Sequence, residues 1–245
     1  MKKCRAVPAI VLAAVCLTGC SQFKAEHNAV KLKKDGSVQT AVIDNLDKSY
    51  YDGEELKTMI DEAVADYNES SGEESIVVKK FESSEDSVQL YMNYAASEDY
   101  QKFNNVTFYA GDLQGAYDNK YEFPDSFKQV EKGKVTGTAT KSDILNGLNY
   151  YVLIYSEEMD VEVPGRIVYV SSDAAVTGKK TATNIEEVIE QQTESVKEAD
   201  EKSGNTEEGK LEVEEGVLEP ESDTETEKSA DEDNDEHKLT YIIYE

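Results

Sequence analysis

Runs of alternating and β-branched hydrophobic residues predict a sheet in the first 170 residues of the chain. The clearest run is 88–94, where Val88, Leu90, Met92 and Tyr94 alternate with more polar neighbours. A period of two predicts a strand with one buried face. Strands are predicted over 38–43, 76–81, 88–94, 106–109, 150–155 and 166–170. The polar segment 83–86 between two of these runs is typical of a hairpin loop.

One long helix is predicted over about 53–69. Its apolar residues recur at helical spacing, with most acidic residues away from that stripe. Asp52 precedes the helix as an N-cap residue, and Gly72 follows it as a residue suited to end it. The stripe consists of Leu56, Ile60, Ala63, Val64 and Tyr67. Shorter helices are predicted over 97–104, with Ser97 as its cap, and over 113–117.

The order of these elements predicts the fold class and the extent of the domain. Strands come before, between and after the helices without a regular βαβ repeat, so we predict an α+β domain over 29–183 with a mainly antiparallel sheet. The run 239–244 is a strong strand pattern after about 50 polar residues. Because a free apolar strand would promote aggregation, we expect 239–245 to return to the sheet as its closing strand. The alternative is pairing with the sheet edge of a partner protein.

The segment 184–238 has a different composition from the predicted domain. Residues 186–238 carry 22 Asp or Glu against 5 Lys, and no aromatic residue lies between 170 and 240. Such a segment buries too little apolar surface to offset the cost of ordering the chain. We therefore predict an acidic, low-complexity and largely disordered loop, with its most helical part beginning at Ile185.

The N-terminal residues follow the plan of a secretory signal. Lys2, Lys3 and Arg5 precede an apolar run over 6–17. About a dozen residues in a helix rise only about 18 Å, less than the roughly 30 Å core of a bilayer. A basic start, a short apolar stretch and small residues at its end predict a signal peptide over 1–19.

The four residues Leu17-Thr18-Gly19-Cys20 resemble the lipobox of bacterial lipoproteins. This resemblance implies cleavage before Cys20, a diacylglyceryl group on its thiol and acyl chains such as palmitate. Two or more chains anchor a protein firmly where one chain binds marginally. We expect Cys20 to hold the protein at the extracytoplasmic side of the cell membrane, with 20–28 as a tether.

Charge and residue usage restrict the chemistry of the mature chain. Loss of the signal takes the formal net charge from −27 to −30, which disfavours a nucleic-acid partner or adhesion to an anionic leaflet. Cys4 and Cys16 leave with the signal, so neither disulfides nor Cys-based zinc sites are expected. His27 and His237 lie in no triad or metal pattern. We assign no catalytic residue, cofactor or metal site.

Three features could carry chemistry and are weighed against simpler interpretations. The carboxylates Glu157, Glu158, Asp160 and Glu162 follow a strand and could form an acid–base pair or bind Ca²⁺, but acids are so common in this chain that a solvated turn accounts for the cluster. Residues 231–235 have part of a calcium-loop spacing but lack its glycine, so they are not assigned as a site. The 15 Tyr residues could present a carbohydrate- or peptide-binding face, or pack in the core.

Several segments resemble a group of small lipoproteins from Gram-positive anaerobic bacteria. The resemblance covers most of 20–180 and the last strand, and it implies localisation and architecture but no activity. The segments are 49–56, 66–68, 98–104, 164–171 and 241–244.

Together these features predict a membrane-anchored binding or envelope-interaction module that is not an enzyme, with an unknown envelope partner. One alternative is an accessory lipoprotein of a membrane transport or envelope complex. A second is a cell-envelope hydrolase that uses the carboxylates of 157–162.

Overall fold

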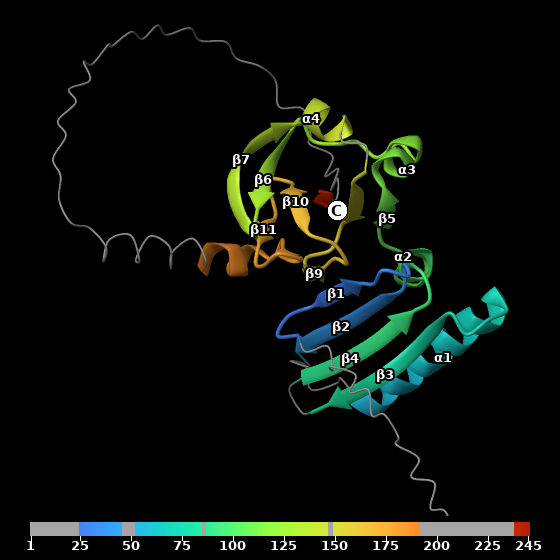
Figure 1. Cartoon of the computed structure of the whole chain (residues 1–245). Coiled ribbons are helices and arrows are strands. Elements are labelled where there is room, and N and C mark those ends of the chain that lie inside the picture. The colour runs from blue at the N-terminus through green and yellow to red at the C-terminus, as the bar shows by residue number, and fades with distance from the viewer. Residues whose placement is uncertain (1–24, 46–51, 85–86, 147–148, 192–237) are drawn as a thin grey trace, which may run out of the picture.

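The computed structural model describes residues 25–45, 52–84, 87–146, 149–191 and 238–245 (Figure 1). They form an α+β fold with two mostly antiparallel sheets, which confirms the predicted fold class. The predicted signal peptide, Cys20, His237 and most of the acidic segment lie outside these residues.

The seven-stranded sheet has the order β11-β12-β9-β1-β2-β4-β3. Its neighbours are antiparallel except β1 and β9, which are parallel. The predicted hairpin is formed by β3 and β4, and its residues 85–86 are not described. The strands are β1 Ala29–Leu32, β2 Val38–Asn45, β3 Ile76–Ser83, β4 Ser87–Tyr94, β9 Asp160–Glu162, β11 Ala175–Val176 and β12 Thr181–Thr183.

The six-stranded sheet has the order β5-β8-β13-β10-β6-β7 and is antiparallel throughout. The last strand of the chain, β13, lies between β8 and β10. The closing-strand prediction is therefore confirmed, and pairing of this strand with a partner's sheet is wrong. The strands are β5 Phe108–Asp112, β6 Ser126–Glu131, β7 Lys134–Thr140, β8 Tyr151–Tyr155, β10 Ile167–Val170 and β13 Thr240–Tyr244.

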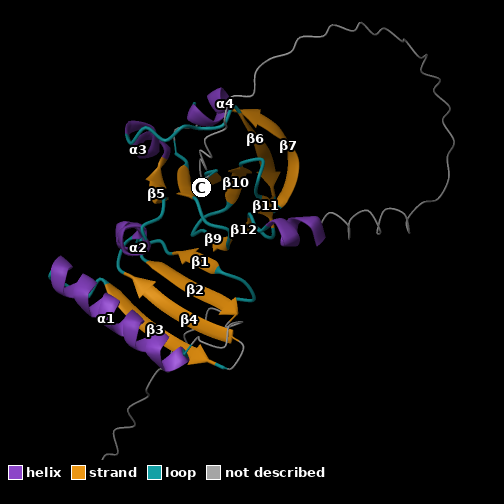
Figure 2. Cartoon of the chain, turned by 180° about the vertical axis from the view of Figure 1, so that it is seen from behind, coloured by secondary structure: helices purple, strands orange, loops and turns teal. Residues whose placement is uncertain are grey.

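Helix α1, Gly53–Ser71, confirms the predicted long helix. The Asp52 carboxylate accepts hydrogen bonds from the N–H groups of Glu54 and Glu55, and Gly72 ends the helix with φ 77°. That left-handed conformation carries little steric penalty for glycine. Figure 2 shows α1 alongside β3, at the opposite edge of the sheet from β11 and β12.

The shorter helices are α2 Ser97–Asn104, α3 Leu113–Asp118 and α4 Lys141–Leu145, and residues 186–191 are also helical. The predicted Ser97 cap is wrong by one position. Ala96 is the N-cap, and its N–H donates to the Asp99 carboxylate at 3.1 Å. The strand predicted from 106 begins instead at Phe108, because Asn105 ends α2 in the left-handed region with φ 55°.

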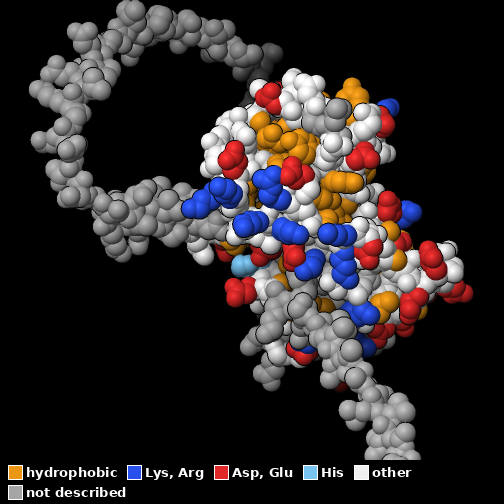
Figure 3. Space-filling model, in the orientation of Figure 1, with side chains coloured by type: hydrophobic (Ala, Val, Ile, Leu, Met, Phe, Trp, Pro, Cys, Tyr) orange, Lys and Arg blue, Asp and Glu red, His pale blue; other side chains and the backbone are white. Residues whose placement is uncertain are grey.

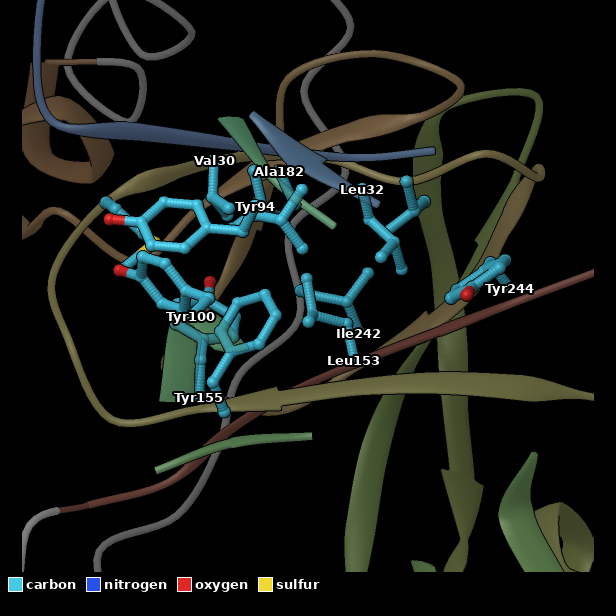
Figure 4. Packing of buried hydrophobic residues seen from close by; sticks show 14 of the residues in the cluster. Val30, Leu32, Tyr94, Tyr100, Leu153, Tyr155, Ala182, Ile242 and Tyr244 are labelled. Carbon is cyan, nitrogen blue, oxygen red and sulfur yellow. The ribbon is translucent and has the colours of Figure 1, made fainter. Parts of the chain in front are cut away.

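Two hydrophobic clusters lie on opposite faces of the six-stranded sheet, and β13 contributes to both. Ile242 and Tyr244 belong to the cluster that also contains Val30 and Tyr94 of the seven-stranded sheet (Figure 4). Tyr241 and Ile243 belong to the cluster beneath α3 and α4. All five residues of β13 are buried.

The acidic segment starts and ends at one place on the domain. The Asn184 side-chain amide donates to the Thr240 hydroxyl at 3.0 Å and to the Glu157 carbonyl at 3.0 Å. Its carbonyl oxygen accepts the Met159 N–H at 2.9 Å, and the Thr240 hydroxyl donates to the Asp173 carboxylate. A loop whose two ends are fixed beside each other adds little closure cost when it lengthens, about 0.6 kcal/mol per doubling.

Deletion of residues 239–245 should abolish cooperative folding. Four large side chains of β13 are buried, and burial of each contributes about 1.5–3 kcal/mol, together comparable with the 5–15 kcal/mol stability of a typical domain. Thermal denaturation followed by circular dichroism measures the effect. A truncated chain with an unchanged melting temperature would contradict this role of β13.

Replacement of 192–237 by a short Gly/Ser linker should leave the fold intact. The contacts of Asn184 with Thr240 lie outside the replaced segment and keep the two ends together. We expect a melting temperature within a few degrees of that of the full chain, measured in the same way. Loss of the cooperative transition would show that the acidic segment itself stabilises the domain.

Candidate functional site

The four carboxylates of 157–162 do not converge on a common point. Glu157 accepts a hydrogen bond from the Tyr100 hydroxyl at 2.6 Å. Asp160 lies 3.3 Å from the His27 ring, and Glu162 pairs with Lys31 at 2.8 Å. Glu158 is exposed. Within the part of the chain that is described, no three His, Cys, Asp or Glu side chains form a metal-binding group.

The parallel pairing of β1 and β9 explains where two of these carboxylates lie. It places Lys31 opposite Glu162 and Ala29 opposite Asp160. The strand therefore directs each carboxylate to a partner on the neighbouring segment rather than to another carboxylate. Glu157 instead connects the turn after β8 to α2, and its charge adds to the burial that raises the pKa of Tyr100.

A groove of about 470 Å³ lies where the β1–β2 turn meets one end of the six-stranded sheet. Tyrosine and glycine residues line one side of this groove and lysine residues the other, so we name it the tyrosine groove. Its lining residues are Leu32, Lys33, Lys34, Gly36, Ala110, Gly111, Tyr151, Pro164, Gly165, Tyr244 and Glu245.

Two stacked tyrosine rings give the groove a flat aromatic surface. Tyr151 of β8 and Tyr244 of β13 are paired on adjacent strands. Their rings stack, with centroids 5.8 Å apart and an interplanar angle of 21°. Tyr244 is buried, whereas 52% of Tyr151 is exposed. The buried ring thus supports the exposed one from behind, and Tyr151 presents a fixed apolar face to solvent.

A close backbone approach forms the rim of the groove. The main-chain groups of Arg166 and Glu245 exchange hydrogen bonds of 2.9 and 3.0 Å, and their side chains form an ion pair. Gly165 lies directly beside this contact, where a Cβ atom would collide with the Glu245 carbonyl. Glycine is required here because only a residue without a side chain leaves this space.

Seven basic residues continue from the groove across the molecular surface, and we name them the basic band. Three hairpin turns and the turn before β10 supply them. In Figure 3 Lys and Arg side chains gather over the region of β1, β9 and β11. The members are Lys33, Lys34, Lys132, Lys134, Arg166, Lys179 and Lys180.

Backbone contacts hold the turns of the basic band together. Lys179 and Lys180 lie in the β11–β12 turn, and their carbonyls accept the N–H groups of Ile167 and Val163, both at 2.9 Å. Gly133, in the β6–β7 turn, lies so close to residues 178 and 179 that an added Cβ would come within 3.1–3.2 Å of their backbone. The lysines of the β6–β7 and β11–β12 turns therefore have fixed relative backbone positions.

The sequence could indicate only part of this site. A carbohydrate- or peptide-binding tyrosine face was one open interpretation and stays a prediction. The structure shows Tyr151 exposed, whereas Tyr94, Tyr100, Tyr155 and Tyr241 are core residues. The basic band had no recognisable signal, because each lysine pair alone looks like an ordinary solvated turn.

Comparison with protein-family models, with curated proteins and with solved structures gives no match for this chain. None of the helices formed by the described ranges has the length and apolar character needed to span a bilayer.

The buried tyrosines predict loss of stability at alkaline pH. Burial raises the pKa of Tyr241 and of Tyr244 to about 12, above the value near 10 expected in the unfolded chain. The folded state therefore keeps protons that the unfolded state loses. The contribution of these two tyrosines to the free energy of unfolding should be constant below about pH 9 and should fall between pH 10 and 12.

Urea denaturation at several pH values measures this dependence. Tyr244→Phe removes one of the titrating groups and should make the alkaline decline shallower. Tyr117→Phe, at an exposed position, is the matched control and should leave the slope unchanged. Equal slopes for all three proteins would show that Tyr244 does not contribute.

Proposed function

We propose that this protein is a lipoprotein anchored at the extracytoplasmic side of the cell membrane through Cys20, and that its folded domain is a non-enzymatic binding module. The tyrosine groove is the binding surface in this proposal. The resemblance to lipoproteins of Gram-positive anaerobic bacteria and the lipobox support the location.

The arrangement of the tyrosine groove is the observation that carries the binding proposal. Binding sites are commonly concave, largely preformed and located where structural elements meet. Here β8 of the six-stranded sheet positions Tyr151, and the β1–β2 turn of the seven-stranded sheet supplies Lys33 and Lys34. Because β8 and β13 are buried strands, the aromatic face needs no rearrangement before it can bind.

The arrangement of the carboxylates favours binding over hydrolysis. A hydrolase of the second alternative would need two carboxylates on either side of a shared substrate position. Glu157, Asp160 and Glu162 each lie against a different partner residue instead. The tyrosine groove, by contrast, offers the Tyr151 ring for stacking and the Lys33 and Lys34 charges for ion pairing, and both can act in binding alone.

Substitution of the predicted lipidated residue tests the anchoring part of this proposal. Cys20→Ala should move the protein from the membrane fraction to the soluble fraction, because it removes the thiol that would carry the acyl chains. Cell fractionation and immunoblotting measure the distribution. The released protein should keep the melting temperature of the domain.

Two other cysteines of the same chain provide controls. Cys4→Ala and Cys16→Ala should leave the protein in the membrane fraction, since both residues are predicted to leave with the signal peptide. A Cys20→Ala protein that remains in the membrane after a carbonate wash would contradict lipid anchoring.

Capture of partners tests the binding part. Detergent extracts of native membranes are passed over immobilised domain, with Tyr151→Ala as the comparison. Retention of the same envelope components by both proteins would show that the tyrosine groove is not the binding surface.

A further inference from the structure

The tyrosine groove and the basic band form one continuous surface. Pro164 and Gly165 line the groove, and the Lys180 ammonium group donates to the Pro164 carbonyl at 2.8 Å. Arg166 follows directly in the chain. A ligand that extends beyond the groove would therefore meet Arg166 and the β11–β12 turn next.

We propose that this surface binds an anionic polysaccharide, with a sugar ring on Tyr151 and its acidic substituents on the lysines of the basic band. This inference rests on the proposed function and names the ligand class of the same site. The attraction is local, because charges are screened over about 8 Å at physiological ionic strength. The net negative charge of the chain therefore does not prevent it.

The extent of the basic band favours a polymer over a single small anion. A small anion would be satisfied by one lysine pair, whereas the band carries pairs on three separate turns. The close approach of Gly133 to the backbone of residues 178 and 179 fixes the spacing between the lysine pairs of the β6–β7 and β11–β12 turns. The third pair, Lys33 and Lys34, lines the same groove as Pro164, whose carbonyl accepts from Lys180. A chain with repeating negative groups matches such a series of fixed positive positions.

The tyrosine pair favours a sugar over a non-sugar polyanion. Tyr151 offers a flat ring whose orientation is maintained by Tyr244 beneath it. The axial C–H groups of a pyranose pack against such a ring, and its hydroxyl groups need acceptors at the edge. The Glu245 carboxylate, at the rim of the groove, is such an acceptor.

Carboxylates around the band disfavour a lipid membrane as the ligand. Adhesion to an anionic leaflet needs a surface of nearly uniform positive charge. Here Asp35 follows Lys34, and Glu131 shares the β6–β7 turn with Lys132. The Tyr151 ring also lies in a concave groove rather than at a protruding edge.

Binding of defined polymers tests the inference. The full chain without its signal and with Cys20→Ala is titrated with polygalacturonate, an anionic pyranose polymer, and with neutral dextran and polyphosphate. Microscale thermophoresis at low and physiological salt measures affinity. We expect binding to polygalacturonate that weakens with salt, weaker binding to polyphosphate, and none to dextran.

Substitutions separate the two components of the site. Tyr151→Ala should weaken polygalacturonate binding about tenfold and leave polyphosphate binding unchanged. The combination of Lys33→Gln, Lys34→Gln, Lys179→Gln and Lys180→Gln should weaken both. The matched control is Lys57→Gln with Lys79→Gln on α1 and β3, at the opposite edge of the sheet, and it should change neither.

Several results would overturn the inference. They are equal binding of dextran and polygalacturonate, polygalacturonate binding that none of the five substitutions at Tyr151 and the four lysines weakens, and binding to anionic lipid vesicles in preference to polygalacturonate. If polygalacturonate binds only when a Gly/Ser linker replaces 192–237, the acidic segment of the chain itself occupies the basic band, and this result too would overturn the inference. If polymer binding fails while Tyr151-dependent capture of envelope components persists, the proposed function stands and only the ligand class is wrong.

Discussion

The fold depends on burial of β13 between β8 and β10. This strand is buried on both faces, and its side chains alternate between the two hydrophobic clusters. Without it the six-stranded sheet would be divided into two parts, and the cluster shared with the seven-stranded sheet would lose Ile242 and Tyr244. A single short strand thus connects the centre of one sheet to the packing of the other.

This constraint also explains how a long acidic segment is accommodated. The chain must return after residue 191 to place β13, and Asn184 and Thr240 fix the two ends of the excursion beside each other. The length between them has little effect on closure, because the cost rises only logarithmically. The length of the segment therefore places little constraint on the packing of the domain.

The candidate site is a product of the same packing. Tyr244 is buried as part of β13, and it supports the exposed ring of Tyr151. The approach of Glu245 to Arg166 brings the turn before β10 beside the groove, and the β11–β12 turn packs on that segment. Stability and the proposed recognition surface therefore share residues, and substitutions in the groove need readouts of both.

The sequence by itself determined the α+β class, α1 and its caps, the β3–β4 hairpin and the return of the last strand, because periodicity, capping and turn residues act over a few neighbours. It did not indicate β1, β6, β7, β9, β11 or β12, whose runs are short or polar and are stabilised by pairing with distant segments. Only the tertiary structure separated the carboxylates of 157–162 and joined four distant turns into the basic band. Such contacts depend on sheet order and register, which local patterns do not encode.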